Sequence, residues 1–63
     1  MNTEKKVSSH EVLNGGTIEL FSIECFFYVK SVVNGVVKFS EAVGKGKAEF
    51  FIFDAVHYGC LDF

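Results

Sequence analysis

The dipeptide Asn34-Gly35 separates two runs of β-branched residues in the stretch "SVVNGVVKF". This dipeptide is typical of a tight β-hairpin turn, because asparagine and glycine both tolerate positive φ angles. We therefore predict two antiparallel strands that meet at residues 34 and 35. The hairpin commits the middle of the chain to a β-sheet.

The length of the hairpin loop decides which side chains share a face of the sheet. A two-residue turn pairs Val33 with Val36 and places Phe39 on the face of Lys30. A three-residue loop places Phe39 on the face of Val29 instead and collects the lysines on the opposite face. We favour the three-residue loop, because it leaves one face of the hairpin apolar.

Residues that favour strands dominate positions 17–33, "TIELFSIECFFYVKSVV", and no glycine or proline interrupts them. Successive side chains of a strand point to opposite faces of the sheet. The odd positions predict the core face: Phe21, Ile23, Cys25, Phe27 and Val29. The other face is mixed and includes Phe26 and Tyr28. Because Ile18 and Leu20 have the opposite parity, we expect a bulge or a strand break near Leu20.

The stretch "AEFFIFDAV", residues 48–56, contains four consecutive large apolar side chains. Clustered phenylalanine and isoleucine favour a strand, which we place from Ala48 to Tyr58 after a glycine turn in "GKGKA". A helix over residues 47–58 is the alternative. Such a helix would be apolar nearly all round, which is unusual for a surface helix.

The first residues of the chain have little apolar content. We expect a flexible N-terminus over residues 1–9 and a single small β domain over residues 10–63. The stretch "SSHEVLNGG" is ambiguous. Ser8 and Glu11 fit a helical capping box, whereas "EVL" before two glycines fits a short strand and a turn. We favour the strand.

Together these segments predict an all-β fold, or a β-dominated α+β fold with one short helical turn. The expected sheet is an antiparallel meander of three to four strands, and both of its faces contain large apolar side chains. Sixty-three residues form a single domain near the lower size limit for independent folding. No helix long enough to cover the sheet is expected, so a second subunit is the expected cover for one face.

The outer face of the expected sheet has more apolar surface than the chain itself can cover. With the odd-numbered residues of the last strand in the core, Phe50 and Ile52 stand outside, where they meet Phe26 and Tyr28. Burying one large apolar side chain contributes roughly 1.5–3 kcal/mol, so four represent about 6–12 kcal/mol. The predicted partner-binding residues are Phe26, Tyr28, Phe50, Ile52 and Tyr58.

These features lead to the hypothesis of a small, non-enzymatic protein-interaction module that self-associates as a homodimer, binds a protein target, or does both. Edge strands are a second route to binding, through strand addition. Small proteins without catalytic sites are frequently inhibitors or adaptors from phage or mobile elements, and we extend the expectation to such a role. No signal peptide or membrane-spanning stretch is visible, which predicts a cytoplasmic protein without a membrane partner.

A single-stranded nucleic-acid-binding module is the alternative hypothesis. Phe26 and Tyr28 lie on the expected face of Lys30 and Lys38, where rings could stack on bases while lysines contact phosphates. The net charge of −2, the absence of arginine and the presence of Glu24 on the same face disfavour nucleic acid without excluding it.

No residue pattern predicts catalysis, a cofactor or a metal site. His10, Cys25, His57 and Cys60 have the composition of a zinc site but lack the two closely spaced ligand pairs that zinc modules use. A serine or cysteine nucleophile beside either histidine has no third, orienting group. A Cys25–Cys60 disulfide stays open, although the absence of an export signal favours two free thiols.

Overall fold

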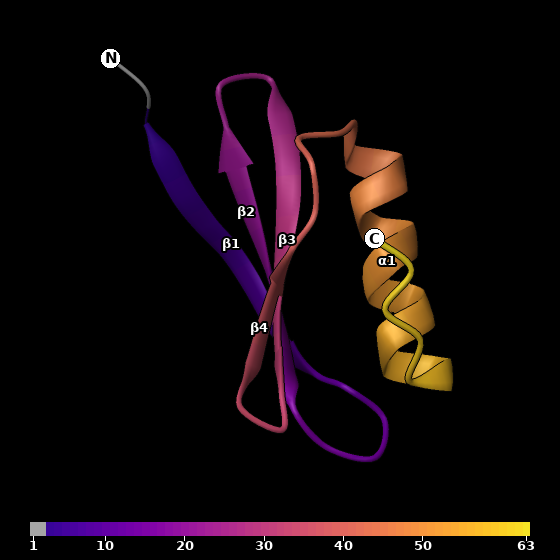
Figure 1. Cartoon of the computed structure of the whole chain (residues 1–63). Helices are drawn as coiled ribbons and strands as arrows, with labels where there is room; N and C mark the ends of the chain where they lie inside the picture. Colours follow the sequence, from indigo (N-terminus) through magenta and orange to yellow (C-terminus); the bar gives the residue numbers. More distant parts are fainter. Residues whose placement is uncertain (1–2) are drawn as a thin grey trace.

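The structure is a computed structural model that describes residues 3–63 of the chain. Its elements are β1 (Glu4–Glu11), β2 (Thr17–Ile23), β3 (Phe26–Val33), β4 (Val36–Phe39) and α1 (Lys45–Tyr58). The strands form one antiparallel sheet in the order β1-β2-β3-β4, and α1 lies along one face of it (Figure 1). The predicted β-dominated α+β class, with an antiparallel meander of three to four strands, is confirmed, and the helix is longer than the single turn that was expected.

β1 begins earlier than the composition suggests. Residues 4–9, expected to be flexible, belong to β1 and pair with β2. Strand pairing rather than burial orders them, since most of β1 is exposed. A register shift between Lys6 and Ser8 marks a bulge at Val7. Residues 1–2 lie outside the described residues.

The chain reverses between Ile23 and Phe26, not near Leu20. Ile23 pairs with Phe26, and Glu24 in the turn has a φ angle of 55°. Glutamate and cysteine are not typical turn residues, so the composition contains no signal for this reversal. The reversal changes the parity of the core positions, and Leu20 of β2 pairs with Val29 of β3 in the core.

A two-residue turn joins β3 to β4, so the three-residue loop expected from the sequence is wrong. Asn34 and Gly35 have φ angles of 52° and 77°, the positive values that a type I′ turn needs at both central positions. Phe39 consequently lies opposite Lys30, on the face that points away from α1.

Lys38 lies on the helix side of β4, where an apolar residue was expected. Its Nζ donates a hydrogen bond to the carbonyl oxygen of Leu61 at 2.9 Å and lies 5.3 Å from the centre of the Phe63 ring. The C-terminal residues therefore give the ammonium group partners on this side of the sheet. These contacts make the two-residue turn compatible with a lysine on the core side.

Residues 45–58 form a helix, so the predicted strand from Ala48 to Tyr58 is wrong and the helical alternative is correct. Side chains at helical spacing are buried against the sheet: Ala48, Phe51, Ile52 and Ala55. The "GKGKA" segment, expected as a turn between strands, begins this helix with Gly44 as its N-cap. The helix ends at Gly59, whose φ angle of 69° is typical of a helix C-terminus.

The core lies between the sheet and α1. It contains Val12, Ile18, Leu20 and Val29 from the sheet side and the four buried residues of α1. The last residues run back along α1, and the ring of Phe63 packs 5.3 Å from that of Phe51 (Figure 1). No element among residues 3–63 covers the other face of the sheet. The expectation that no helix covers the sheet is therefore wrong, because α1 packs on one of its faces.

Candidate functional site

The sheet face that points away from α1, which we name the open face, is left uncovered by the described residues and contains several large apolar side chains. The strand registers assign its apolar side chains: Phe21, Ile23, Phe26, Tyr28, Val32, Val37 and Phe39. Phe26, Val37 and Phe39 expose 49%, 51% and 58% of their surface. Single exposed apolar residues are normal, whereas a contiguous group on one face is typical of an interaction site.

Aromatic rings form a row across three strands of the open face. Phe21 and Tyr28 are registered partners whose rings stack at 5.1 Å with an interplanar angle of 9°. Tyr28 continues the row to Phe39 on β4, with ring centres 6.3 Å apart. The ammonium group of Lys30 lies 5.9 Å from the centre of the Phe39 ring. The two rings at the β2–β3 end of the row are stacked, whereas the rings of Tyr28 and Phe39 are tilted by 48°.

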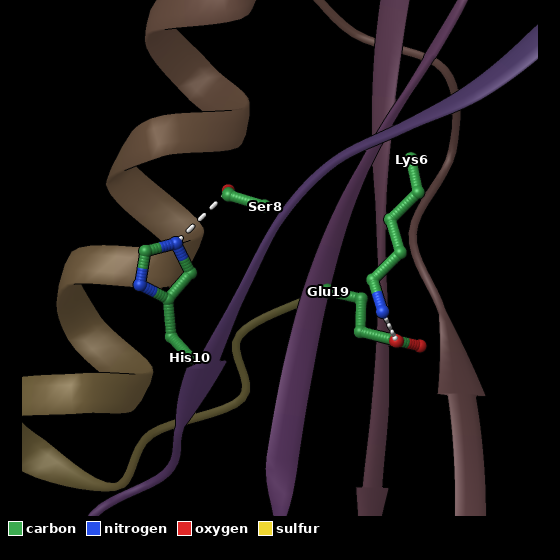
Figure 2. A network of polar contacts seen from close by, with 4 residues as sticks. All are labelled: Lys6, Ser8, His10 and Glu19. Atoms are coloured by element: carbon green, nitrogen blue, oxygen red, sulfur yellow. Dashed lines mark hydrogen bonds and ion pairs between the residues drawn. The ribbon is translucent and has the colours of Figure 1, made fainter.

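The charged groups of the open face lie mainly toward β1. Lys6 and Glu19 form an ion pair with 2.7 Å between Nζ and Oε2 (Figure 2). The hydrogen bond from Lys6 is the main cause that lowers the pKa of Glu19 below its usual value. Desolvation, and then the carboxylate of Glu4, raises the pKa of Tyr28 to about 12. Tyr28 is therefore a neutral phenol at physiological pH.

The predicted partner-binding residues do not form one surface. Phe26 and Tyr28 lie on the open face as expected. Phe50 and Tyr58 are exposed on α1, with 60% and 66% of their surface accessible, on the opposite layer of the molecule. Ile52 is 8% exposed and belongs to the core, so its expected place on an outer face is wrong. In a helix, residue 52 shares the buried stripe with residue 51, which a strand would not allow.

A second aromatic group lies on the exposed side of α1, and we name it the helix patch: Phe50, Phe53, His57 and Tyr58. The rings of Phe53 and His57 have centres 4.3 Å apart, and those of Phe53 and Tyr58 are 6.1 Å apart. Phe53 exposes 48% of its surface. The helix patch is narrower than the open face because a single helix supports it.

Four residues of the open face were not predicted to be there. Phe21 and Ile23 were expected on the core face, because the turn at residues 24 and 25 was not recognised. Phe39 and Val37 were assigned to the opposite face because the predicted hairpin loop was one residue too long. The Asn-Gly dipeptide is the signal that could have placed both, because it favours a two-residue turn with positive φ at each position.

The helix side of the sheet contains a small polar group beside α1. Ser8 and His10 share a hydrogen bond of 3.0 Å on the side of β1 that faces α1 (Figure 2). They border a shallow pocket of about 340 Å³ between β1 and α1. Cys25, expected in the core, is exposed in a turn, and Cys25 and Cys60 are both free. Within residues 3–63, no three His, Cys, Asp or Glu side chains are grouped closely enough to hold a metal ion.

The two edges of the sheet are protected against strand addition. β1 has a bulge at Val7 and charged residues at its start, and β4 is four residues long. Bulges, charges and short edge strands all disfavour pairing with another chain. The open face is therefore a better candidate than either edge.

No family model, curated protein or solved structure matches this chain. Among the described residues, no helix is long and apolar enough to cross a membrane. The function must therefore be inferred from the open face itself.

Proposed function

We propose that this protein is a non-enzymatic protein-interaction module that binds an apolar protein surface through its open face. The observation that supports the proposal is a four-stranded sheet with a core on one face and an uncovered aromatic row on the other. A cytoplasmic location and a role as an inhibitor or adaptor from phage stay predictions from the sequence.

The free energy available on the open face is large for so small a chain. A phenylalanine buries about 200 Å² when fully covered. Phe26 and Phe39 each expose about half of their surface, so roughly 100 Å² of each ring can still be buried. At about 25 cal/mol per Å², covering both rings contributes about 5 kcal/mol. This equals the lower end of the stability of a whole domain, about 5–15 kcal/mol.

The charge of the molecule favours a protein over a nucleic acid as the occupant. The net charge is −2, and none of the six basic residues is an arginine. On the open face, the ammonium group of Lys6 is paired with the carboxylate of Glu19 and is not free to meet a phosphate. Nucleic-acid surfaces gain most of their affinity from unpaired basic residues that neutralise phosphates.

Single-stranded nucleic acid is the second candidate, and one observation favours it. Lys30 lies beside the exposed Phe39 ring, and Tyr28 stacks on Phe21, so the open face combines stacking platforms with a cation. Binding of a fluorescent oligonucleotide at 50 mM salt that weakens as salt is raised would support this candidate. The absence of binding at 50 mM salt would remove it.

Photo-cross-linking from β4 tests the protein-binding proposal. With p-benzoylphenylalanine in place of Phe39, we expect a light-dependent covalent adduct with protein in cells. The same residue in place of Val36 should form none, because Val36 is 66% exposed but lies on the other side of β4. Adding Val37→Ser on the open face should remove the adduct. No protein adduct at position 39, or equal adducts from both positions, would overturn the proposal.

A further inference from the structure

We infer that the pocket between β1 and α1 binds a free α-amino acid with an aliphatic side chain. This pocket, which we name the β1–α1 pocket, has a volume of about 340 Å³. The volume is within the range of small-molecule sites, about 300–1,000 Å³. Four polar residues line it: Ser8, His10, Lys45 and Glu49. The pocket lies on the helix side of the sheet, so the inference does not rest on the function proposed for the open face.

The bulge at Val7 places the polar side chains of β1 in this pocket. Lys6, before the bulge, pairs with Phe21 of the open face. Ser8, after the bulge, pairs with Leu20 of the core. In a regular strand, residues 6 and 8 would share a face, because side chains alternate with a period of two. The extra residue turns Ser8 toward α1 (Figure 2), and such bulges are frequent beside functional sites, where they redirect side chains.

Ser8 and His10 form the polar wall of the pocket on β1. A hydrogen bond of 3.0 Å joins Oγ of Ser8 and Nε2 of His10, and both residues are half-buried. When Nε2 donates this bond, the serine hydroxyl is free to donate to a ligand carboxylate. When the hydroxyl donates it, the serine oxygen can accept from a ligand ammonium group. The pair can therefore meet either charged end of a zwitterion.

The wall on α1 contains one positive and one negative side chain. Lys45 and Glu49 lie four positions apart on the helix and both line the pocket. This spacing permits an ion pair, but lysine on the N-terminal side of glutamate is the less favourable order. Among residues 3–63, neither side chain forms an ion pair. The ammonium group and the carboxylate are therefore both available to a ligand.

The order of these two charges fixes the orientation of the ligand. Lys45 is the first residue of α1, whose first turn has no acidic residue and whose N-cap, Gly44, makes no side-chain hydrogen bond. The N-terminal end of a helix favours a nearby negative charge. The ligand carboxylate therefore belongs beside Lys45, and the ligand ammonium group belongs beside Glu49, one turn further along the helix.

The floor of the pocket is apolar and reaches the core. Leu20 and Ile52 expose only 4% and 8% of their surface, whereas Val7 at the rim exposes 50%. An aliphatic ligand side chain would cover Val7, and each methylene group that it buries strengthens binding by about fourfold. A carboxylic acid or an amine alone would leave one charged residue of α1 without a partner. An aliphatic α-amino acid matches the floor and both charges.

An NMR titration of the ¹⁵N-labelled full chain with L-leucine tests the inference. We expect saturable shifts of the amide resonances of residues 7–10 and 45–52. Three analogues each lack one part of the ligand. Glycine lacks the side chain and should bind at least about tenfold more weakly. 4-Methylpentanoate lacks the ammonium group and L-leucinamide lacks the carboxylate, and each should bind about two- to fivefold more weakly, as expected for the loss of one exposed ion pair.

Charge-removing variants assign the two ends of the ligand. Lys45→Gln should weaken leucine about two- to fivefold without weakening leucinamide. Glu49→Gln should weaken leucine equally without weakening 4-methylpentanoate. Both residues are exposed, so the circular dichroism signal should stay unchanged. Lys47→Gln is the matched control, because Lys47 is also exposed on α1 but does not line this pocket, and leucine binding should be unchanged.

The possible outcomes separate the parts of the inference. The absence of saturable shifts with leucine, or shifts confined to residues away from β1 and α1, would overturn the site. Binding of 4-methylpentanoate or leucinamide as tight as that of leucine would overturn the zwitterion as the ligand. An equal loss of affinity in Lys45→Gln and Lys47→Gln would overturn the role of Lys45, because it would indicate a general effect of charge.

Discussion

Replacing Gly16 with alanine should destabilise the fold more than the same change at its neighbour Gly15. Both glycines lie in the β1–β2 loop with positive φ angles, 100° at Gly16 and 115° at Gly15. A Cβ atom at Gly16 would lie 2.7 Å from the carbonyl oxygen of Val32 and 2.7 Å from Cγ2 of Val33. A Cβ atom at Gly15 meets no heavy atom within 4 Å. The two variants therefore share the backbone strain and differ in the overlap with β3.

The magnitudes follow from these two effects. An alanine held at a positive φ angle costs about 1–2 kcal/mol, so we expect Gly15→Ala to lower the free energy of unfolding by about that amount. Overpacking typically costs a further 1–3 kcal/mol or so, and the atom in the way is a backbone oxygen that cannot rotate aside. Gly16→Ala should thus lower the free energy of unfolding by about 2–5 kcal/mol, which approaches the whole stability of a small domain.

Urea unfolding followed by circular dichroism measures the difference between the two variants. All samples need one protein concentration, because any self-association would raise the apparent stability by mass action. We expect Gly16→Ala to be less stable than Gly15→Ala by at least about 1 kcal/mol, which corresponds to about 4–8 °C in Tm for a domain of this size. Equal losses of stability in both variants would refute the close approach of Gly16 to β3.

Three further predictions concern single side chains. Ser31 is fully buried and its hydroxyl has no partner among the described residues, so Ser31→Ala should raise the free energy of unfolding by about 1 kcal/mol; a lower urea midpoint would contradict this. The pKa of Tyr28 in the folded state, about 12, exceeds its ordinary value of 10.0. The contribution of the neutral phenol to the free energy of unfolding is therefore complete below pH 10 and is lost as the pH rises toward 12. Tyr28→Phe should remove that loss from the alkaline limb of a stability–pH curve, and an unchanged limb would argue against it. Lys6 lowers the pKa of Glu19, so the ion pair adds to the free energy of unfolding above the ordinary glutamate pKa, and this addition is lost as the pH falls through the lower folded value. Lys6→Met should therefore flatten the acid limb of the stability–pH curve. An acid limb of unchanged slope would show that the pair is not formed.

The sheet was predictable because turn chemistry and strand propensity act locally. Asn34 and Gly35 placed the β3–β4 hairpin correctly, and the β-forming residues around them identified β3 and β4. The length of the loop could not be predicted from the assumption that one face of the hairpin is entirely apolar. Lys38 shows why, since its alkyl chain can lie on the core side while its ammonium group reaches the carbonyl oxygen of Leu61.

The helix was mispredicted because its central residues fit both the two-residue period of a strand and the 3.6-residue period of a helix. Phenylalanine and isoleucine favour strands, and their unbroken run gives no alternation that would distinguish a buried strand from a helix. The small residues on either side were more informative. Ala48 and Ala55 lie at helical spacing from the buried Phe51 and Ile52, and Gly59 follows at the position of a helix stop. These signals could have identified α1, and with it the cover of one sheet face.

The open face was predictable in part for the same reasons. Phe26 and Tyr28 were placed correctly because the parity within β3 does not depend on where the strand begins. Phe21 was not, because its face depends on the unrecognised turn at Glu24. The face on which Phe39 lies depends on the length of the β3–β4 hairpin loop. Residues within one strand were thus predictable, whereas relations between strands required the turns to be known.

The surplus of apolar surface, by contrast, does not depend on the type of secondary structure. Four consecutive large apolar side chains at residues 50–53 cannot all enter one core, because a strand divides them two and two and a helix spreads them around most of a turn. α1 buries Phe51 and Ile52 and leaves Phe50 and Phe53 exposed by 60% and 48%. The predicted exposed pair, Phe50 and Ile52, is therefore wrong in one member, because the helix buries Ile52 and exposes Phe53 instead. Phe50 and Phe53 lie on the layer opposite the open face, so apolar side chains are exposed on both layers of the molecule.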